Sequence, residues 1–147
     1  QPIAVKRIYI DKGPKEKRPL GIPAIKDRIV QMALKMTIEP IFEIEFLPTS
    51  HGFRPRRGSK GALAEVDKLL KEGYSHVVDV DFKSYFDTIS HKHLMDEVEA
   101  RIADGRILKL IRKFLEQEIM EGVKKWTPSE GTPQGGLCKA LHKPPYA

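Results

Sequence analysis

With 147 residues, of which 40% are hydrophobic and 31% charged, the chain has the makeup of a globular protein of one domain or two small lobes. No apolar run approaches the roughly 20 residues that a membrane helix needs, and the lone cysteine, Cys138, excludes an intramolecular disulfide, so we expect a cytoplasmic protein. The net charge of +6 suits an acidic partner such as nucleic acid, although such a balance is common among proteins.

The chain opens with a predicted basic hairpin. Residues 5–10 have the β-branched and aromatic character of a strand, and residues 11–17 contain the glycine and proline of a turn. Residues 18–23 return as a short second strand. Because Pro19 and Pro23 cannot donate hydrogen bonds to a neighbouring strand, we expect this return strand at an edge of its sheet.

Three helices are predicted next. Over residues 25–38 apolar side chains recur at helical spacing, and Pro40 is expected to end this helix and begin another short one. After an irregular stretch, Ser59 is expected to cap a third helix that ends at Gly73. The residues predicted to form the apolar faces of these helices are Ile25, Ile29, Met32, Ala33 and Met36 in the first, Ile41, Phe42, Ile44 and Phe46 in the second, and Leu63, Val66, Leu69 and Leu70 in the third.

The second half of the chain alternates strands with helices. An apolar strand over residues 76–81 ends in carboxylates, a helix capped by Ser90 follows, and another helix extends from Gly105 to Ile119. A strand over residues 122–126 comes next. Strands separated by helices, with a hairpin in front, predict an α+β architecture.

Basic side chains concentrate in two glycine- and proline-rich segments. The first spans residues 6–28, and the second contains no acidic residue. The cations of the second segment are Arg54, Arg56, Arg57 and Lys60. Both segments are typical of loops that face nucleic-acid phosphates, and the alternative is that they are two solvated loops. His91 and His93, at the start of a predicted helix, are interpreted as surface residues.

Acidic residues gather at the end of the strand predicted over residues 76–81. Because side chains alternate along a strand, Asp79 and Asp81 share one face. Asp81 closes the strand, where its carboxylate could project into a cleft, and Mg²⁺ prefers hard oxygen ligands of this kind. An aspartate at a strand end is more often a cap or turn residue, so the strand alone leaves both interpretations open.

Four segments of the chain carry recognisable motifs, namely residues 18–31, 51–59, 81–89 and 131–136. The third reads Asp-Phe-Lys-Ser-Tyr-Phe-Asp-Thr-Ile, and the fourth reads Gly-Thr-Pro-Gln-Gly-Gly. The four resemble, in the same order, motifs of the reverse transcriptases of group II introns and related retroelements. The first resembles the fingers motif, the second the block after it, the third the palm motif, and the fourth the palm block that touches the incoming nucleotide.

The resemblance implies an RNA-directed DNA polymerase that adds deoxynucleotides to a primer with the help of two Mg²⁺ ions. It assigns Asp81 and the backbone carbonyl of Phe82 to the metal. Phe86 would lie beneath the sugar and exclude a 2′-hydroxyl, and the alternative for this residue is an ordinary core phenylalanine. Asp79 is not expected to be a ligand, and Asp87 is expected to be structural.

The same resemblance implies further contacts to the nucleotide. Lys12 and Arg18 would hold the triphosphate from both sides of the hairpin turn, with Lys15 and Lys17 as competitors for the role of Lys12. Gln134 would contact the sugar or the base. The second basic segment would contact the phosphates of template or primer, and the strand that it contacts stays open.

The chain departs from the family pattern near its end. No adjacent Asp pair occurs in it, although the family's metal site needs one beyond Gln134, and residues 137–147 suggest a divergent or non-native tail. The resemblance places fingers at residues 1–75 and a partial palm, with an incomplete antiparallel sheet, at residues 76–147. Because one carboxylate does not hold two divalent ions, we expect the isolated polypeptide not to polymerise DNA. Exposed apolar surface is expected to favour self-association.

The partners implied by the resemblance are RNA template, intron RNA, DNA primer and deoxynucleoside triphosphates, without a membrane. A second interpretation is a non-enzymatic maturase-type module that binds RNA and aids intron splicing. Both predict an RNA affinity that falls with salt, and they differ in the use of nucleotides. A third interpretation, a basic α+β protein unrelated to polymerases, would make the four motifs coincidental.

Overall fold

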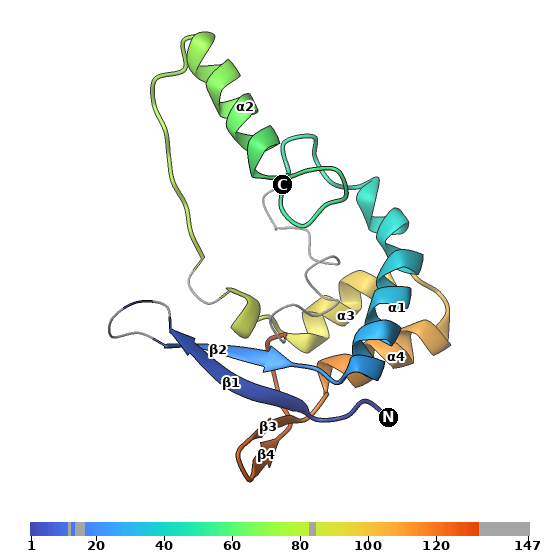
Figure 1. Cartoon of the computed structure of the whole chain (residues 1–147). Coiled ribbons are helices and arrows are strands. Elements are labelled where there is room, and N and C mark those ends of the chain that lie inside the picture. Colours follow the sequence, from blue (N-terminus) through green and yellow to red (C-terminus); the bar gives the residue numbers. More distant parts are fainter. Residues whose placement is uncertain (12, 14–16, 83–84, 133–147) are drawn as a thin grey trace.

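The computed structural model describes residues 1–11, 13, 17–82 and 85–132. It contains a four-stranded sheet and four α-helices, which confirms the predicted α+β class (Figure 1). Helices α1, α3 and α4 gather beside the sheet, whereas α2 extends away from it. Within the described residues, no helix combines the length and the apolar character needed to cross a membrane.

The sheet has the strand order β2-β1-β3-β4. Strands β1 (Val5–Asp11) and β2 (Lys17–Ile22) form the predicted antiparallel hairpin, and β2 lies at an edge, as Pro19 requires. The predicted strand near residue 124 is also present as β4 (Lys124–Trp126). Its partner β3 (Ile119–Glu121) was predicted as the end of a helix, and it pairs with β1 in parallel, whereas an antiparallel sheet was expected.

Helix α1 (Ile25–Glu43) is longer than predicted because it continues through Pro40. The proline removes one backbone donor near the end of the helix, and the next turn stays helical because Phe42 is buried in the core. The separate short helix predicted after Pro40 is therefore the last turn of α1. The helix ends at Glu43, with Ile44 as its C-cap.

The buried face of α1 is the reverse of the predicted one. Its core residues are Leu34, Ile38 and Phe42, which are at most 6% exposed. The residues predicted to be buried are exposed instead: Ile25, Ile29, Met32 and Met36 are between 56% and 72% exposed, and Ala33 is exposed as well. Both sets recur at helical spacing on opposite sides of one helix, so periodicity alone could not decide which of them meets the rest of the protein.

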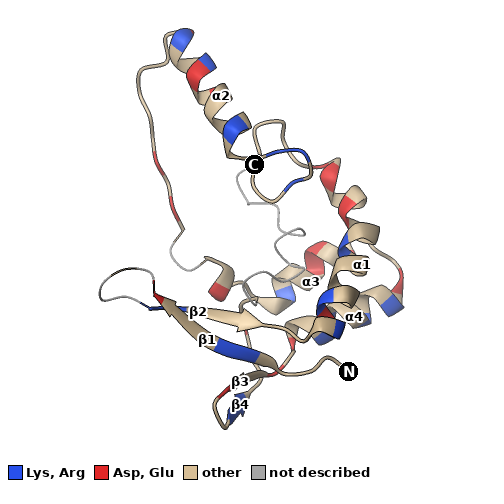
Figure 2. Cartoon of the chain, in the orientation of Figure 1, with Lys and Arg blue, Asp and Glu red and all other residues tan. Residues whose placement is uncertain are grey.

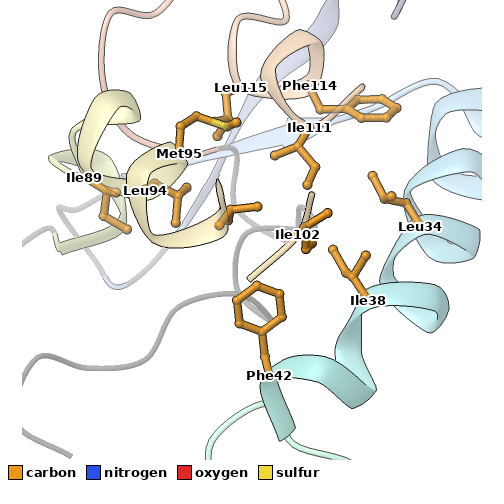
Figure 3. Close-up of a cluster of buried hydrophobic side chains, with 11 residues drawn as sticks. Leu34, Ile38, Phe42, Ile89, Leu94, Met95, Ile102, Ile111, Phe114 and Leu115 are labelled. Carbon is orange, nitrogen blue, oxygen red and sulfur yellow. The ribbon is translucent and has the colours of Figure 1, made fainter. Parts of the chain in front are cut away.

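The core lies between α1, α3 (His91–Glu99) and α4 (Gly105–Leu115), as Figure 3 shows. Ser90 caps α3 as predicted, because its hydroxyl accepts a hydrogen bond from the His93 amide. Asp104 caps α4 by accepting bonds from the amides of Arg106 and Ile107. The residues that α3, α4 and the adjoining chain bury are Ile89, Leu94, Met95, Val98, Ile102, Ile111, Phe114 and Leu115.

Helix α2 (Ser59–Lys71) has the predicted extent and lacks the predicted burial. Its N-cap is Gly58 rather than Ser59, and Gly73, with φ of +101°, ends it as predicted. The apolar residues expected to be buried, Leu63, Val66, Leu69 and Leu70, are between 39% and 67% exposed. The spacing correctly placed these residues on one face, but within the part of the chain that the structure describes no element covers that face.

The strand predicted over residues 76–81 is absent, and these residues have no regular secondary structure. Val77, Val78 and Val80 are between 69% and 87% exposed. A strand is stable only when its backbone pairs with a neighbour, and none of the described strands extends a ladder to this segment. The β-branched residues thus favour a strand, but no strand of the described residues pairs with them.

A buried carboxylate joins three distant parts of the fold. Asp27, in the first turn of α1, accepts a 2.8 Å hydrogen bond from the Ile3 amide and a 3.0 Å bond from the Gln117 side chain. Gln117 also donates to the Ile3 carbonyl. Both Asp27 and Gln117 are less than 8% exposed. This contact fixes the start of the chain, α1 and the segment after α4 to one another, and so holds β1 beside β3.

Candidate nucleotide-binding site

The segment predicted to hold a metal ion begins in extended chain and ends in a short helix. Asp81 and Phe82 are exposed and have no regular secondary structure, and η1 (Tyr85–Asp87) is a single 3₁₀ turn. Lys12 and Gln134, predicted to bind the nucleotide, lie outside the described residues, as does Lys15. Their roles stay predictions.

Aromatic rings connect the 81–89 motif to the 51–59 motif. The Phe86 ring meets the Phe53 ring edge-on with centroids 6.3 Å apart, and the Tyr85 ring at 5.7 Å. Phe82 lies 5.9 Å from Tyr85. Phe86 is half-buried against the hydrophobic core. The ring predicted to lie beneath a sugar is therefore fixed by its neighbours while part of its surface stays accessible.

The beginning of the 131–136 motif is bound to the same segment by its backbone. The Gly131 amide donates a 2.8 Å hydrogen bond to the Ile89 carbonyl, and the Thr132 amide donates a 2.7 Å bond to the Phe86 carbonyl. Gly131 has φ of +80°, and a Cβ atom there would lie 2.5 Å from the Asp87 carbonyl oxygen. Only glycine permits this conformation and approach. Three of the four motifs thus meet at Phe86.

His91 has a structural partner, in contrast to the surface role predicted for it. Its Nε2 atom donates a 2.7 Å hydrogen bond to the Gly131 carbonyl, 40 residues along the chain. Asp87 and Ile89 contact the other side of the same glycine. His91 therefore helps to hold the 131–136 motif against the 81–89 motif.

Replacing His91 by phenylalanine is expected to loosen the Gly131 turn while leaving the helical core folded. The loss of one partly buried hydrogen bond costs about 1 kcal/mol. Hydrogen exchange measured by NMR should show faster exchange of the Gly131 and Thr132 amides. His91→Gln, whose amide nitrogen can reach the same carbonyl, should restore most of the protection. Equal exchange rates in wild type and both variants would contradict this role.

The second basic segment divides into a structural residue and exposed ones. The Arg54 side chain is only 6% exposed, and its guanidinium donates to both carboxylate oxygens of Glu43 and to the carbonyls of Leu47 and Ser50. It also lies 5.1 Å from the Phe46 ring centroid. Arg54 thus fastens the loop to the end of α1 and is engaged within the protein, although it was predicted to contact phosphates.

The Glu43–Arg54 pair makes stability depend on pH. Hydrogen bonding from Arg54 lowers the pKa of the Glu43 carboxyl below its ordinary value of 4.5. Because the folded pKa is the lower one, the pair stabilises the fold above pH 4.5, and this contribution disappears as the pH falls through the lowered pKa. The melting temperature of the wild type should therefore exceed that of Glu43→Gln at neutral pH, and the two should converge in acid. A difference that is constant with pH would contradict this expectation.

The other three cations of this segment surround a cavity of about 820 Å³ at the start of α2. Arg56, Arg57 and Lys60 are exposed, and His51 lines the same cavity. Arg57 donates to the Pro48 carbonyl. Figure 2 shows basic residues on the loop that leads into α2. The arrangement suits a chain of phosphates, which cations attract and the positive end of a helix dipole favours.

Arg18 lies on β2 with its side chain exposed. It pairs with Ile10 in the hairpin register, whereas the neighbouring Pro19 pairs with Tyr9. Because side chains alternate along a strand, Arg18 and Pro19 point to opposite faces of the sheet. The register does not bring Arg18 to Asp81 or Phe86, so its role at the triphosphate stays a prediction.

The donor atoms at Asp81 and Phe82 fit magnesium in kind. A carboxylate and a backbone carbonyl are hard oxygen ligands. Within the described ranges, however, no three side chains of histidine, cysteine, aspartate or glutamate converge on a position where they could hold a metal ion. The role of Asp81 and Phe82 as magnesium ligands therefore stays a prediction.

Three contributions to this region escaped the sequence analysis. The contact of Gly131 with Asp87 and the bond from His91 join residues about 40 positions apart, and no local pattern signals them. The third is Trp126, the only tryptophan of the chain, which lies against Arg7. The sequence does contain a signal for Trp126, because this residue ends a predicted strand and directly follows two lysines.

Comparison with known proteins identifies the family of the chain. The family model described as reverse transcriptase (RNA-dependent DNA polymerase) matches residues 10–138. Protein YkfC of Escherichia coli K12 is 41% identical over 145 residues, which are 96% of this chain and 38% of that protein. Group II intron-encoded protein LtrA of Lactococcus lactis is 38% identical over 141 residues, which are 95% of this chain and 23% of that protein.

More distant similarities agree with these two. The mitochondrial Nuclear intron maturase 1 of Arabidopsis thaliana is 27% identical over 113 residues, or 77% of this chain and 16% of that protein. A chain of the partial Cas6-RT-Cas1–Cas2 complex superposes with a TM-score of 0.59 at 21% identity, covering 96% of this chain and 25% of that one, which shows a shared fold. This chain spans less than half the length of each of these relatives.

Proposed function

Because this chain belongs to the reverse transcriptase (RNA-dependent DNA polymerase) family, we propose that it supplies the nucleotide-binding part of an RNA-directed DNA polymerase of the group II intron type. In this role residues 1–75 act as fingers and residues 76–147 as part of the palm. The observation that carries the proposal is the meeting of three motifs at Phe86. The Phe53 ring touches its ring, and the Thr132 amide binds its carbonyl.

Asp81 and the Phe82 carbonyl take the metal side of the reaction in this proposal. Magnesium, which reverse transcriptases use, would activate the primer 3′-hydroxyl and neutralise charge on the leaving pyrophosphate. Both residues are accessible, and the carboxylate provides one of the hard oxygen ligands that such an ion needs. Further carboxylates must complete the site, since one cannot organise two divalent ions.

The remaining predicted residues would bind and select the nucleotide. Lys12 and Arg18 would hold the triphosphate, and Gln134 would contact the sugar or base. Phe86 would exclude a 2′-hydroxyl. Its half-buried ring is held by its neighbours, which supports this role because a ring that selects deoxynucleotides by steric exclusion must be rigid. The hydrogen bond from the Thr132 amide to the Phe86 carbonyl brings the start of the 131–136 motif next to Phe86.

RNA template, intron RNA and DNA primer are the proposed macromolecular partners, and the cytoplasm is the proposed location. The exposed cations Arg56, Arg57 and Lys60 would contact backbone phosphates. The apolar side chains exposed between Val77 and Val80 would favour self-association, which light scattering over a range of concentrations would reveal. A clean monomer at high concentration would contradict that part of the proposal.

RNA binding that weakens with salt is the first expected result. The double replacement of Arg56 and Lys60 by alanine should reduce the affinity for single-stranded RNA, and it should reduce the slope of log affinity against log salt by roughly 0.7 for each phosphate that the variant no longer neutralises. The matched control replaces Lys68 and Lys71 by alanine. Both lie on α2, as Lys60 does, and both pair with acidic side chains. Absence of RNA binding at low salt would overturn the proposal.

Primer extension tests the catalytic part. The 147-residue polypeptide contains no adjacent Asp pair, so with primer, RNA template, Mg²⁺ and deoxynucleotides it is expected to make no DNA. Template-dependent DNA synthesis would contradict the proposal that Asp81 is the one metal-binding carboxylate of this polypeptide.

A maturase-type function is the second candidate, favoured by the similarity to a nuclear intron maturase. Such a module would keep the fold and the basic loop to bind intron RNA, without using nucleotides. Binding of deoxynucleoside triphosphates by the RNA-bound chain, measured by calorimetry, separates the two candidates. Binding supports the polymerase, and RNA binding without it supports the maturase.

A further inference from the structure

A cavity of about 330 Å³ lies over one face of the sheet. Its floor is formed by all four strands. The floor residues are Val5, Arg7, Pro19, Gly21, Ile119 and Trp126. The strand register places them on a common face, because Arg7 pairs with Gly21 and Ile119 pairs with both Val5 and Trp126. Arg18 projects from the opposite face of the sheet and does not line this cavity.

An aromatic and cationic row crosses this face. The Arg7 guanidinium lies 5.5 Å from the centroid of the Trp126 ring and 5.9 Å from that of Tyr9. Tyr9 is 49% exposed, and Trp126 is half-buried at the cavity. Aromatic rings and guanidinium planes exposed on a sheet are the surfaces on which unpaired nucleobases stack.

The charges around the cavity indicate which part of a nucleotide would enter it. Asp87 and Glu130 line the wall, where their carboxylates would repel a phosphate and could accept hydrogen bonds from the edge of a base. Lys124 is exposed on β4 and shares the face of Trp126, because the two residues are two positions apart. Lys124 can therefore attract the sugar-phosphate backbone while the uncharged base occupies the cavity.

We propose that this sheet face binds single-stranded RNA by stacking an unpaired base on Arg7 and Trp126, with the base edge held between Asp87 and Glu130. The proposal rests on the proposed function, since a bound RNA strand is its ligand. It adds a contact that lies on the far side of the hairpin from Arg18. Asp87 and Gly131 belong to both the cavity wall and the turn beside Phe86, so the stacked base would lie next to the nucleotide site.

Intrinsic fluorescence provides a direct test, because Trp126 is the only tryptophan. A short single-stranded oligoribonucleotide is titrated into the wild-type chain at low salt. Anisotropy of a dye on the RNA reports binding anywhere on the protein, and tryptophan emission reports events at the cavity alone. We expect saturable quenching of the emission with the same midpoint as the anisotropy change.

Two variants and a control sharpen the result. Trp126→Leu removes the stacking ring and should weaken RNA binding roughly 5- to 150-fold, and Trp126→Phe should retain most of the affinity. Arg7→Ala keeps the tryptophan and should reduce both affinity and quenching. Arg106→Ala is the matched control, because its side chain is 95% exposed at the start of α4. Circular dichroism melts establish that each variant is folded.

The outcomes separate this inference from the function on which it rests. RNA binding with unchanged tryptophan emission overturns the stacking site and leaves the proposed function intact. No RNA binding at low salt overturns both. Equal quenching by free deoxynucleoside triphosphates at the same concentrations would show that the cavity binds nucleotides rather than a base of an RNA strand, and would also overturn the proposal.

Discussion

Replacing Gly131 by alanine is expected to lower the free energy of unfolding by roughly 2–5 kcal/mol. The left-handed backbone, with φ of +80°, accounts for roughly 1–2 kcal/mol of this loss. The rest arises because a Cβ atom would lie 2.5 Å from the Asp87 carbonyl oxygen, which is backbone and cannot rotate away. Urea denaturation followed by circular dichroism would measure the change.

Gly122→Ala is the matched control for Gly131→Ala. Gly122 also has a positive φ, of +59°, but nothing lies within 4 Å of its missing Cβ atom. It should therefore cost only the backbone part, roughly 1–2 kcal/mol. If the free energy of unfolding fell equally in the two variants, the close approach of Gly131 to Asp87 would make no contribution to stability. The contact between the 81–89 and 131–136 motifs would then be looser than the structure indicates.

The second large effect is expected at Ile38. This side chain of α1 is 1% exposed in the core that α1 forms with α3 and α4, and its replacement by alanine should destabilise the fold by about 2–5 kcal/mol. Part of the loss is the transfer of apolar surface, and part is the cavity that a close-packed core cannot refill. Thermal and urea melts would both show the decrease.

Ile29→Ala makes the same chemical change on the other side of α1. Ile29 is 64% exposed, so its replacement should change stability by no more than about 0.5 kcal/mol. The pair of variants decides between the face predicted from the sequence and the face observed in the structure. A larger loss at Ile29 than at Ile38 would show that α1 buries the predicted face in solution.

Short-range signals predicted the local structure well. The β1–β2 hairpin, the cap at Ser90 and the helix end at Gly73 were all confirmed, because each depends on a few neighbouring residues. Pro40 was misjudged, since the cost of one missing hydrogen bond near a helix end is offset by burial of Phe42. Propensity is a weak determinant where tertiary contacts compete with it.

The family was recognisable from four motifs in order, and the match to the reverse transcriptase model confirmed it. The roles of Asp81, Arg18 and Phe86 stay predictions. The structure added what joins the motifs in space, namely the Phe53–Phe86 ring contact and the Gly131 turn. It also showed that Arg54 is engaged by Glu43, a partner that no motif revealed.

The sequence by itself determined which residues can share a face of a helix or strand, because that depends only on the geometry of one element. It could not determine which face is covered, because burial depends on a second element that arrives from elsewhere in the chain. The two apolar stripes of α1 and the unpaired residues 76–81 show this limit. Tertiary contacts alone selected Ile38 over Ile29, and tertiary contacts alone decide whether a β-branched segment finds a partner and becomes a strand.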